Sequence, residues 1–203
     1  MKELIIGTTN KAKIAQIRGV LAPLKISVSG VADKNLLPKV AENGQTAREN
    51  AHLKAVAYAK ALNKIVFSMD NALFIDGLPD DQQPGLHVRR INKSDDRVSD
   101  DELLEYYLKI FMGLGESITG HWEVGVCVAT PQGKCAETTI ISQRIFTSHP
   151  SLNKVDGYPL ESIQIDPESG KIISDMSQQE QDEFWQRIIG KQLQEFVCSL
   201  DLD

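Results

Sequence analysis

The feature that most constrains the fold is the alternation of short apolar segments with longer segments of helical pattern. Leu4–Thr8 is apolar and ends in small polar residues, which is typical of a buried strand that enters a turn. Asn10–Leu21 has apolar residues at helical spacing, and Pro23 ends this helix. A second strand is expected at Lys25–Val28, before a loop from Asp33 to Gln45. Strands that alternate with helices in this way predict an α/β fold.

Three segments have the spacing of a capping box, in which a hydroxyl residue precedes a Glu by three positions. They are Thr46–Glu49, Ser99–Glu102 and Ser177–Glu180. The first predicts a long Ala-rich helix. The second predicts a helix that Gly113 and Gly115 close, and the third predicts a C-terminal amphipathic helix.

Apolar and β-branched segments predict the remaining strands. Lys64–Met69 predicts a buried strand that ends at Asp70, and Phe74–Gly85 is rich in turn residues. Ile118–Ala129 alternates between apolar and other residues, and Cys135–Phe146 returns after a Pro-Gln-Gly turn, which predicts a hairpin. The whole pattern predicts a mixed sheet flanked by helices.

Composition limits the class of protein. The chain has 203 residues, enough for one large domain or two small lobes. The net charge of −6 disfavours a protein that grips a nucleic-acid backbone. No apolar run is long enough for a signal peptide or a membrane span, so we expect a cytoplasmic protein. The three cysteines, Cys127, Cys135 and Cys198, are odd in number and widely spaced, so neither a disulfide framework nor a zinc site is expected.

The turn between the first strand and the first helix is a candidate phosphate site. A helix N-terminus offers unpaired amide groups and a partial positive charge. Thr8 and Thr9 would add hydroxyl donors around Asn10, and Lys11 and Lys13 would add ammonium groups. The alternative is an ordinary Asn cap with surface lysines. The glycine pattern of a Walker loop is absent.

Two carboxylates are candidate magnesium ligands. Glu42 lies shortly before the Ala-rich helix, and Asp70 follows a buried strand, where ligand clefts form in α/β sheets. The alternatives are a solvated turn at Glu42 and an Asp that starts a turn at position 70.

In chain order, these residues resemble the inosine triphosphate pyrophosphatase (Ham1-like) family, whose enzymes remove non-standard purine nucleoside triphosphates. The family's T-x-N-x-x-K is matched by Thr8, Asn10 and Lys13. Its E-x-G-x-T-x-x-E-N-A-x-x-K-A is matched by Glu42, Gly44, Thr46, Glu49, Asn50, Ala51, Lys54 and Ala55. Its P-G-x-x-x-x-R is matched by Pro84, Gly85 and Arg90. Order and spacing agree over nearly the whole chain.

The departures from the family pattern fall at the acidic motif and near the C-terminus. Met69 replaces the first Asp of the family's A-D-D-S-G, and Asn71-Ala72 replaces its Ser-Gly pair. The late F-G-Y-D-P has become Asp156-Gly157-Tyr158-Pro159, the S-H-R has become Trp185-Gln186-Arg187, and a family Lys is Gln181. The phosphate and metal end therefore resembles the family, whereas the base-recognition end is rewritten.

The resemblance implies one domain over residues 1–203, an elongated mixed sheet flanked by helices, with two lobes and a central nucleotide cleft. It implies hydrolysis of a nucleoside triphosphate to the monophosphate and pyrophosphate with Mg²⁺, by a homodimer. The net charge and the lack of a long apolar run lead us to expect no nucleic-acid or membrane partner. The implied catalytic residues are Asp70, Lys13 and Lys54, and the implied metal ligands are Glu42 and Asp70. The implied substrate-binding residues are Thr8, Thr9, Asn10, Lys11, Lys13, Lys54, Asn71, Gly157, Tyr158, Gln186 and Arg187.

Two other functions stay open at this point. A nucleotide-binding protein could keep this fold and lose turnover, because Met69 removes a carboxylate. A structural role is the third option, and the retained Asn10, Lys13 and Lys54 argue against it. The sequence does not name the base. Because the amide of Gln186 can donate or accept, we expect weak discrimination between 6-amino and 6-oxo purines.

Overall fold

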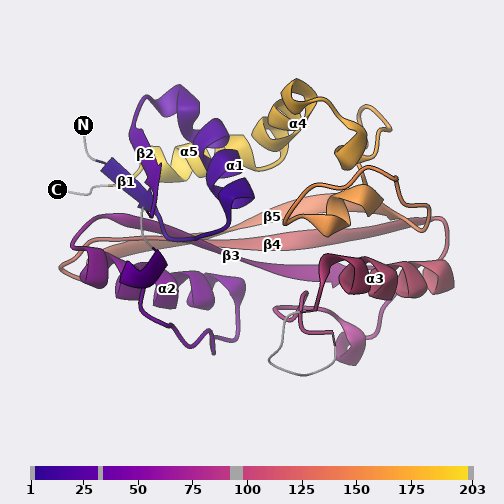
Figure 1. Ribbon diagram of the computed structural model, residues 1–203, viewed down its shortest axis with the longest axis horizontal. Helices are drawn as coiled ribbons and strands as arrows, with labels where there is room; N and C mark the ends of the chain where they lie inside the picture. Colours follow the sequence, from indigo (N-terminus) through magenta and orange to yellow (C-terminus); the bar gives the residue numbers. More distant parts are fainter. Residues whose placement is uncertain (1–2, 32–33, 92–97, 201–203) are drawn as a thin grey trace. The chain divides into compact units, whose positions relative to one another are not determined.

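The computed structural model describes residues 3–31, 34–91 and 98–200. The described residues contain the strands β1 (Glu3–Ile6), β2 (Ser27–Gly30), β3 (Val66–Ile75), β4 (Ser117–Ala129), β5 (Cys135–Thr147) and β6 (Gln164–Ile165). They form a mixed sheet in the order β2-β1-β3-β4-β5-β6, and Figure 1 labels β1 to β5. The strand β1 pairs in parallel with β2 and β3, whereas β5 and β6 are antiparallel. The chain divides into two compact units, and β3, β4 and β5 contribute residues to both. The α/β fold with a mixed sheet and flanking helices is as predicted.

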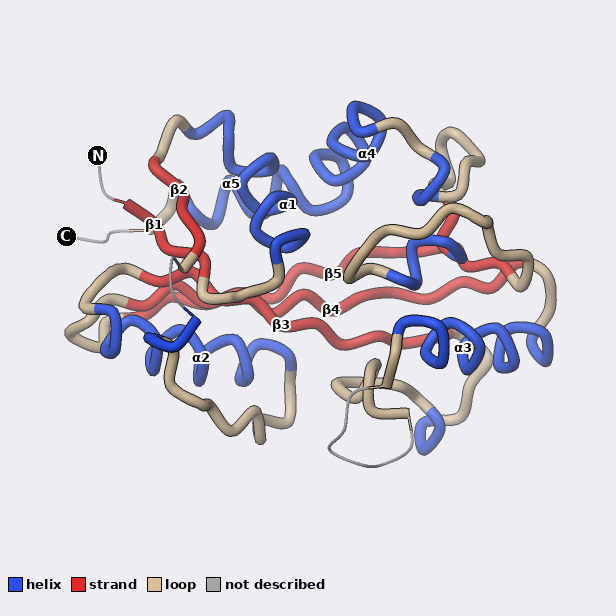
Figure 2. The backbone as a smooth tube through the Cα atoms, viewed as in Figure 1, coloured by secondary structure: helices blue, strands red, loops and turns tan. Residues whose placement is uncertain are grey.

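The first unit comprises residues 1–71, 123–141 and 185–203. Its elements are β1 (Glu3–Ile6), α1 (Lys11–Leu21), β2 (Ser27–Gly30), α2 (Ala47–Leu62), α5 (Lys191–Cys198) and parts of the three long strands. Within this unit, α2 lies on one side of the strands, and α1 and α5 lie on the other (Figure 2).

Small residues on α2 set how closely this helix approaches the sheet. Ala51, Ala55 and Ala59 are buried against strand residues that include Cys127 and Ala129. A Cβ added to Gly125 of β4 would lie 2.2 Å from the backbone carbon of Ala47. Only glycine therefore permits this contact between β4 and the start of α2.

The second unit comprises residues 72–122 and 142–184. It contains α3 (Asp100–Leu114), β6 (Gln164–Ile165), most of α4 (Gln178–Trp185) and the remaining parts of β3 (Val66–Ile75), β4 (Ser117–Ala129) and β5 (Cys135–Thr147). Aromatic and aliphatic side chains from α3 and the strands form its core, among them Leu103, Tyr107, Phe111 and Phe146. The predicted capping box of Ser99 and Glu102 is present at the start of α3.

Most predicted elements are confirmed, including the hairpin, whose turn is closed by a Thr130 N–H bond to the Lys134 carbonyl at 2.8 Å. Two predictions were wrong. The third strand does not end at Asp70 but continues to Ile75, and the turn begins at Asp76 and Gly77, where Gly77 has φ +88°. The C-terminal helix is interrupted by a π-helical turn at Gln186–Gly190.

The Thr46 box is only half formed. The Thr46 hydroxyl accepts from the Glu49 N–H as expected, but the Glu49 carboxylate accepts from Gln45 instead of from the cap residue. In the part of the chain that the structure describes, no helix has the length and apolar character to cross a membrane.

Candidate functional site

The strongest concentration of buried charge in the first unit surrounds the Lys54 ammonium. Its Nζ lies 3.0 Å from Asp70 Oδ1 and 3.4 Å from Glu42 Oε2, and it also donates to the Met69 carbonyl at 3.4 Å. Lys54 is only 9% exposed, whereas the side chains of Glu42 and Asp70 keep 27% and 18% of their surface exposed. The cluster has a formal charge of −1, and its carboxylates remain accessible to a ligand.

The loop that carries Glu42 is clamped onto the start of α2. The Asn50 side-chain oxygen Oδ1 accepts from the Gly44 N–H at 2.9 Å, and the Glu49 carboxylate accepts from the Gln45 N–H at 2.6 Å. A Cβ on Gly44 would lie 2.7 Å from that of Glu49, so a side chain there would push the loop away. Since Asn50 is buried, it is a positioning residue that fixes Glu42 beside Lys54.

Asp70 reaches the cluster from the middle of β3 instead of from its carboxyl end. Alternation along the strand places the Asp70 and Met69 side chains on opposite faces. The Met69 position therefore contributes its carbonyl to Lys54 and no side-chain oxygen. The next residue, Asn71, has a buried Oδ1 with no hydrogen-bond partner among the described residues. A buried acceptor without a partner is uncommon and favours a ligand or water at this point.

The Glu42 and Asp70 carboxylates fit a hard divalent cation by their chemistry. Magnesium prefers one or two carboxylates together with water and substrate phosphate oxygens. Lys54 contacts Oε2 of Glu42 and Oδ1 of Asp70, so the second oxygen of each carboxylate does not face this ammonium and could face a cation brought by a ligand.

The Thr8–Lys13 turn forms an ordinary helix cap in this structure. The Asn10 Oδ1 accepts from the N–H groups of Ala12 and Lys13 at 2.9 and 3.3 Å, and the Asn10 N–H donates to the Thr8 hydroxyl at 3.2 Å. The Asn10 cap thus occupies two of the amides that could bind phosphate. Thr9 and Lys11 are exposed, while Lys13 is half-buried. Their role toward phosphate remains a prediction.

Gln186 lies at the other end of α1. Its Nε2 donates to the carbonyls of Gly19 and Val20 at 3.0 and 3.1 Å, and its Oε1 accepts from Gln194 at 2.8 Å. Contact with a base would require Gln186 to give up these bonds. Arg187 follows in the π-helical turn and is exposed.

Gly157 and Tyr158 belong to the second unit, which also contains the buried ionisable side chains of Glu161 and Arg144. Burial, with a smaller contribution from Glu161, raises the pKa of Tyr158. Burial raises the pKa of Glu161 to about 8, although the Arg144 guanidinium opposes this shift. Arg144 donates to the Ser142 hydroxyl and to Gln164 Oε1. Sequence analysis did not find this buried group, because burial produces it and residue spacing does not reveal burial.

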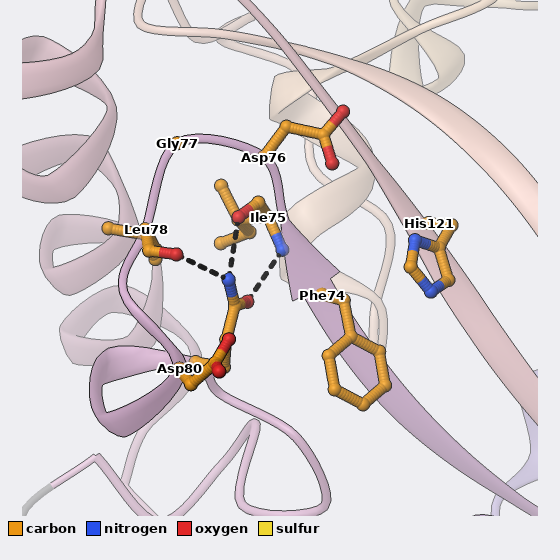
Figure 3. Close-up of a pocket in the computed structure, with 8 residues that line it drawn as sticks. Phe74, Ile75, Asp76, Gly77, Leu78, Asp80 and His121 are labelled. Carbon is orange, nitrogen blue, oxygen red and sulfur yellow. Dashed lines mark hydrogen bonds between the residues drawn. The ribbon is translucent and has the colours of Figure 1, made fainter.

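A pocket of about 480 Å³ in the second unit involves none of the predicted site residues. It lies at the end of β3, where Phe74 stacks on His121 with ring centroids 5.2 Å apart (Figure 3). The Gln83 amide crosses it, bonding the backbone of Ile75 and Leu78. Since these hydrogen bonds close the turn, we assign the pocket a structural origin.

A second cluster was missed by the sequence analysis. His52 of α2, Cys127 of β4 and Glu137 of β5 place one potential metal-ligand atom each within 4.8 Å of the others, and Cys135 lies beside them. The cysteine spacing gave no indication of a metal site. The predicted hairpin could have indicated part of this cluster. Cys135 and Glu137 are two positions apart, so their side chains share one face of β5.

The fold and the Lys54 cluster define an α/β protein with an acidic, lysine-containing site, and comparison with known proteins assigns the family. The sequence model of the Ham1 family matches residues 4–192, so the chain belongs to the Ham1 family. The dITP/XTP pyrophosphatase of Halalkalibacterium halodurans is 27% identical over 191 residues, covering 92% of this chain and 94% of that protein. The Geobacillus kaustophilus dITP/XTP pyrophosphatase is 27% identical over 204 residues, covering 94% and 97%.

Solved structures agree with the fold. The Staphylococcus aureus Ham1 protein superposes with a TM-score of 0.72 at 24% identity, covering 97% of this chain and 98% of that one. A HAM1 protein from Coxiella burnetii gives a TM-score of 0.70 at 20% identity, covering 98% and 100%.

Proposed function

We propose that the protein hydrolyses a nucleoside triphosphate to the monophosphate and pyrophosphate, with Mg²⁺ as cofactor. The observation that carries the proposal is the convergence of Glu42 and Asp70 on the buried Lys54 ammonium. Membership of the Ham1 family and similarity to proteins named dITP/XTP pyrophosphatase support it.

Each residue of the cluster has a distinct role in this proposal. Glu42 and Asp70 would hold Mg²⁺, which when bound supplies positive charge against the phosphate oxygens and polarises a water. Lys54 would neutralise charge on the triphosphate, because its ammonium is already fixed by two carboxylates and a carbonyl. Lys13 and the Thr8–Asn10 turn, with Thr9 and Lys11, would add donors to the outer phosphates.

The remaining predicted contacts would surround the nucleoside. The unpartnered Asn71 Oδ1 is suited to accept a hydrogen bond from a ligand hydroxyl or amine. Gly157, Tyr158, Gln186 and Arg187 are proposed to lie around the nucleoside by family resemblance alone. The Gln186 amide would do so while bonded to α1, and therefore without selecting the base. We also propose, from that resemblance and the charge of −6, a single domain over residues 1–203 that works as a cytoplasmic homodimer without nucleic acid.

Product analysis tests the proposed function. The protein is incubated with inosine, xanthosine, adenosine and guanosine triphosphates, with Mg²⁺ or with a chelator. We expect equal amounts of monophosphate and pyrophosphate, and loss of turnover with the chelator. Release of diphosphate and orthophosphate would contradict the proposed bond cleavage. Triphosphate binding without turnover would instead identify a nucleotide-binding protein that has lost catalysis.

A further inference from the structure

A cluster of nitrogen, sulfur and oxygen donors lies between α2 and the β4–β5 hairpin. His52 Nδ1 lies 3.2 Å from Glu137 Oε2 and 3.7 Å from Cys135 Sγ. The ligand atoms of His52, Cys127 and Glu137 are all within 4.8 Å of one another. We call these four residues the hairpin cluster.

Two of the distances between donors match those around a small tetrahedral ion. Zinc bonds of about 2.0–2.1 Å to nitrogen or oxygen and about 2.3 Å to sulfur place the ligand atoms roughly 3.3–3.8 Å apart. The His52–Glu137 and His52–Cys135 distances are already close to these values. The side chains of His52 and Glu137 are 40% and 36% exposed, so they have room to rotate toward an ion.

The charges of the hairpin cluster favour a cation. Once an ion displaces the protons of both thiols, the four donors carry a formal charge of −3, which a divalent ion reduces to −1. Arg48 supplies the opposing charge, because its Nε lies 3.8 Å from Glu137 Oε1, the oxygen that does not face His52. In metal sites, a carboxylate that binds the ion is commonly hydrogen-bonded or paired with a further protein group.

The backbone under the hairpin cluster is fixed before any ion arrives. Cys127 is fully buried on β4, and the Gly125–Ala47 contact holds β4 against the start of α2, which carries His52. The free thiol of Cys127 packs in the same apolar cluster as the alanines of α2. The core of the first unit therefore sets the separation of the backbone segments that carry Cys127 and His52.

We propose that the hairpin cluster binds one zinc ion that joins α2 to the β4–β5 hairpin. The mixture of imidazole and thiolate donors selects zinc over magnesium, which prefers oxygen ligands. This site is separate from Glu42 and Asp70 and does not rest on the proposed function. Four protein ligands leave no open position, so the ion has a structural role.

Cobalt substitution tests the proposal, because Co²⁺ bound by thiolate gives charge-transfer absorption that carboxylate-bound Co²⁺ lacks. Reduced, metal-free protein is titrated with Co²⁺ and then with Zn²⁺. We expect one Co²⁺ per chain with thiolate absorption, displaced by one equivalent of Zn²⁺. Cys135→Ser and His52→Ala should each weaken Zn²⁺ binding at least tenfold. Both side chains are partly exposed, so circular dichroism should show folded variants.

Two matched controls separate this site from others. Cys198→Ser removes an exposed cysteine outside the cluster and should leave the absorption unchanged. Asp70→Asn alters the proposed magnesium site and should also leave it unchanged. Zinc at a hundredfold excess over the wild-type Kd should raise Tm by about 5–10 °C in the wild type and by about half as much or less in Cys135→Ser. Absence of thiolate absorption in the wild type, or its persistence in both cluster variants, would overturn the proposal.

Discussion

The two units bury ionisable side chains in opposite ways. Around Lys54, the carboxylates of Glu42 and Asp70 flank an ammonium and keep part of their surface open. In the second unit, Glu161 is 3% exposed, and burial raises its pKa to about 8, so it is mostly protonated at neutral pH. Its neighbour Arg144 bonds Ser142 and Gln164 and lies over the Phe184 ring.

The difference shows which polar groups can serve a ligand. The Lys54 cluster holds charge near accessible surface, as electrostatic catalysis requires. The residues that replace the family's late Lys and His direct their amides at the protein itself. Gln181 donates to the carbonyls of Ile173 and Met176, and Gln186 donates to those of Gly19 and Val20. These replacements therefore stabilise the fold.

The largest expected effect is that of Asp70→Asn on turnover. The substitution keeps the shape of the side chain and removes the charge that faces Lys54 and the proposed cation. We expect kcat to fall about a hundredfold or more. The measurement is pyrophosphate release at saturating Mg²⁺, with Glu105→Gln, an exposed carboxylate on α3, as the control. A rate near that of the wild type would remove Asp70 from the catalytic site.

The buried carboxyl of the second unit should make stability depend on pH. Between the unfolded pKa of Glu161 and its folded value of about 8, the folded state binds more protons than the unfolded state. The free energy of unfolding should therefore fall as pH rises, by about 2 kcal/mol between pH 6 and pH 8. In Glu161→Gln this fall should be absent. Thermal melts of both proteins across this range compare the slopes, and equal slopes would show that Glu161 is not the group responsible.

Lys13→Ala tests whether the first turn binds phosphate as well as capping α1. Loss of a charge-assisted contact should weaken triphosphate binding about tenfold or more. Nucleoside binding should change little, because a nucleoside has no phosphate to contact. Calorimetric titration with a triphosphate and with its nucleoside compares the two, and an equal loss for both would contradict the role.

The local features of the sequence predicted the fold well where local chemistry decides the structure. The Pro-Gln-Gly hairpin and the Ser99 cap depend on neighbouring residues and are present. The end of β3 was wrong because Asp70 and Asn71 favour turns, yet the strand continues through them within the sheet. The π-helical turn begins at Gln186, whose amide bonds α1, more than 160 residues earlier in the chain, so no local pattern could reveal it.

The sequence predicted those residues of the site that belong to a family motif. The resemblance pointed to Glu42, Lys54 and Asp70, and the structure brings these three together. The clamp by Asn50 and the engaged amide of Gln186 are properties of the folded backbone. Predicting them requires the positions of backbone carbonyl and N–H groups in space, which residue spacing in the sequence does not provide.

A smaller effect is expected from Gln186→Ala. The variant loses hydrogen bonds to the last turn of α1 and should be destabilised by about 1–2 kcal/mol. Relative kcat/KM values for different bases should stay unchanged if this amide stabilises the fold. Gln192→Ala, an exposed glutamine on α5, is the control. A changed base preference with unchanged stability would show that Gln186 contacts the base.

The central claim is that the Lys54 cluster serves the ligand, whereas the amides of Gln181 and Gln186 serve the fold. Its most direct test is kcat/KM for inosine, xanthosine, adenosine and guanosine triphosphates under one Mg²⁺ condition. The Lys54 cluster addresses the phosphates that all four share, whereas the amides at positions 181 and 186 are bound to backbone carbonyls. The account predicts hydrolysis of all four, with values within about tenfold of one another, because no buried donor is left unpaired by the wrong base. A preference of about a hundredfold or more for inosine and xanthosine triphosphates would contradict it and show that the rewritten end still selects the base.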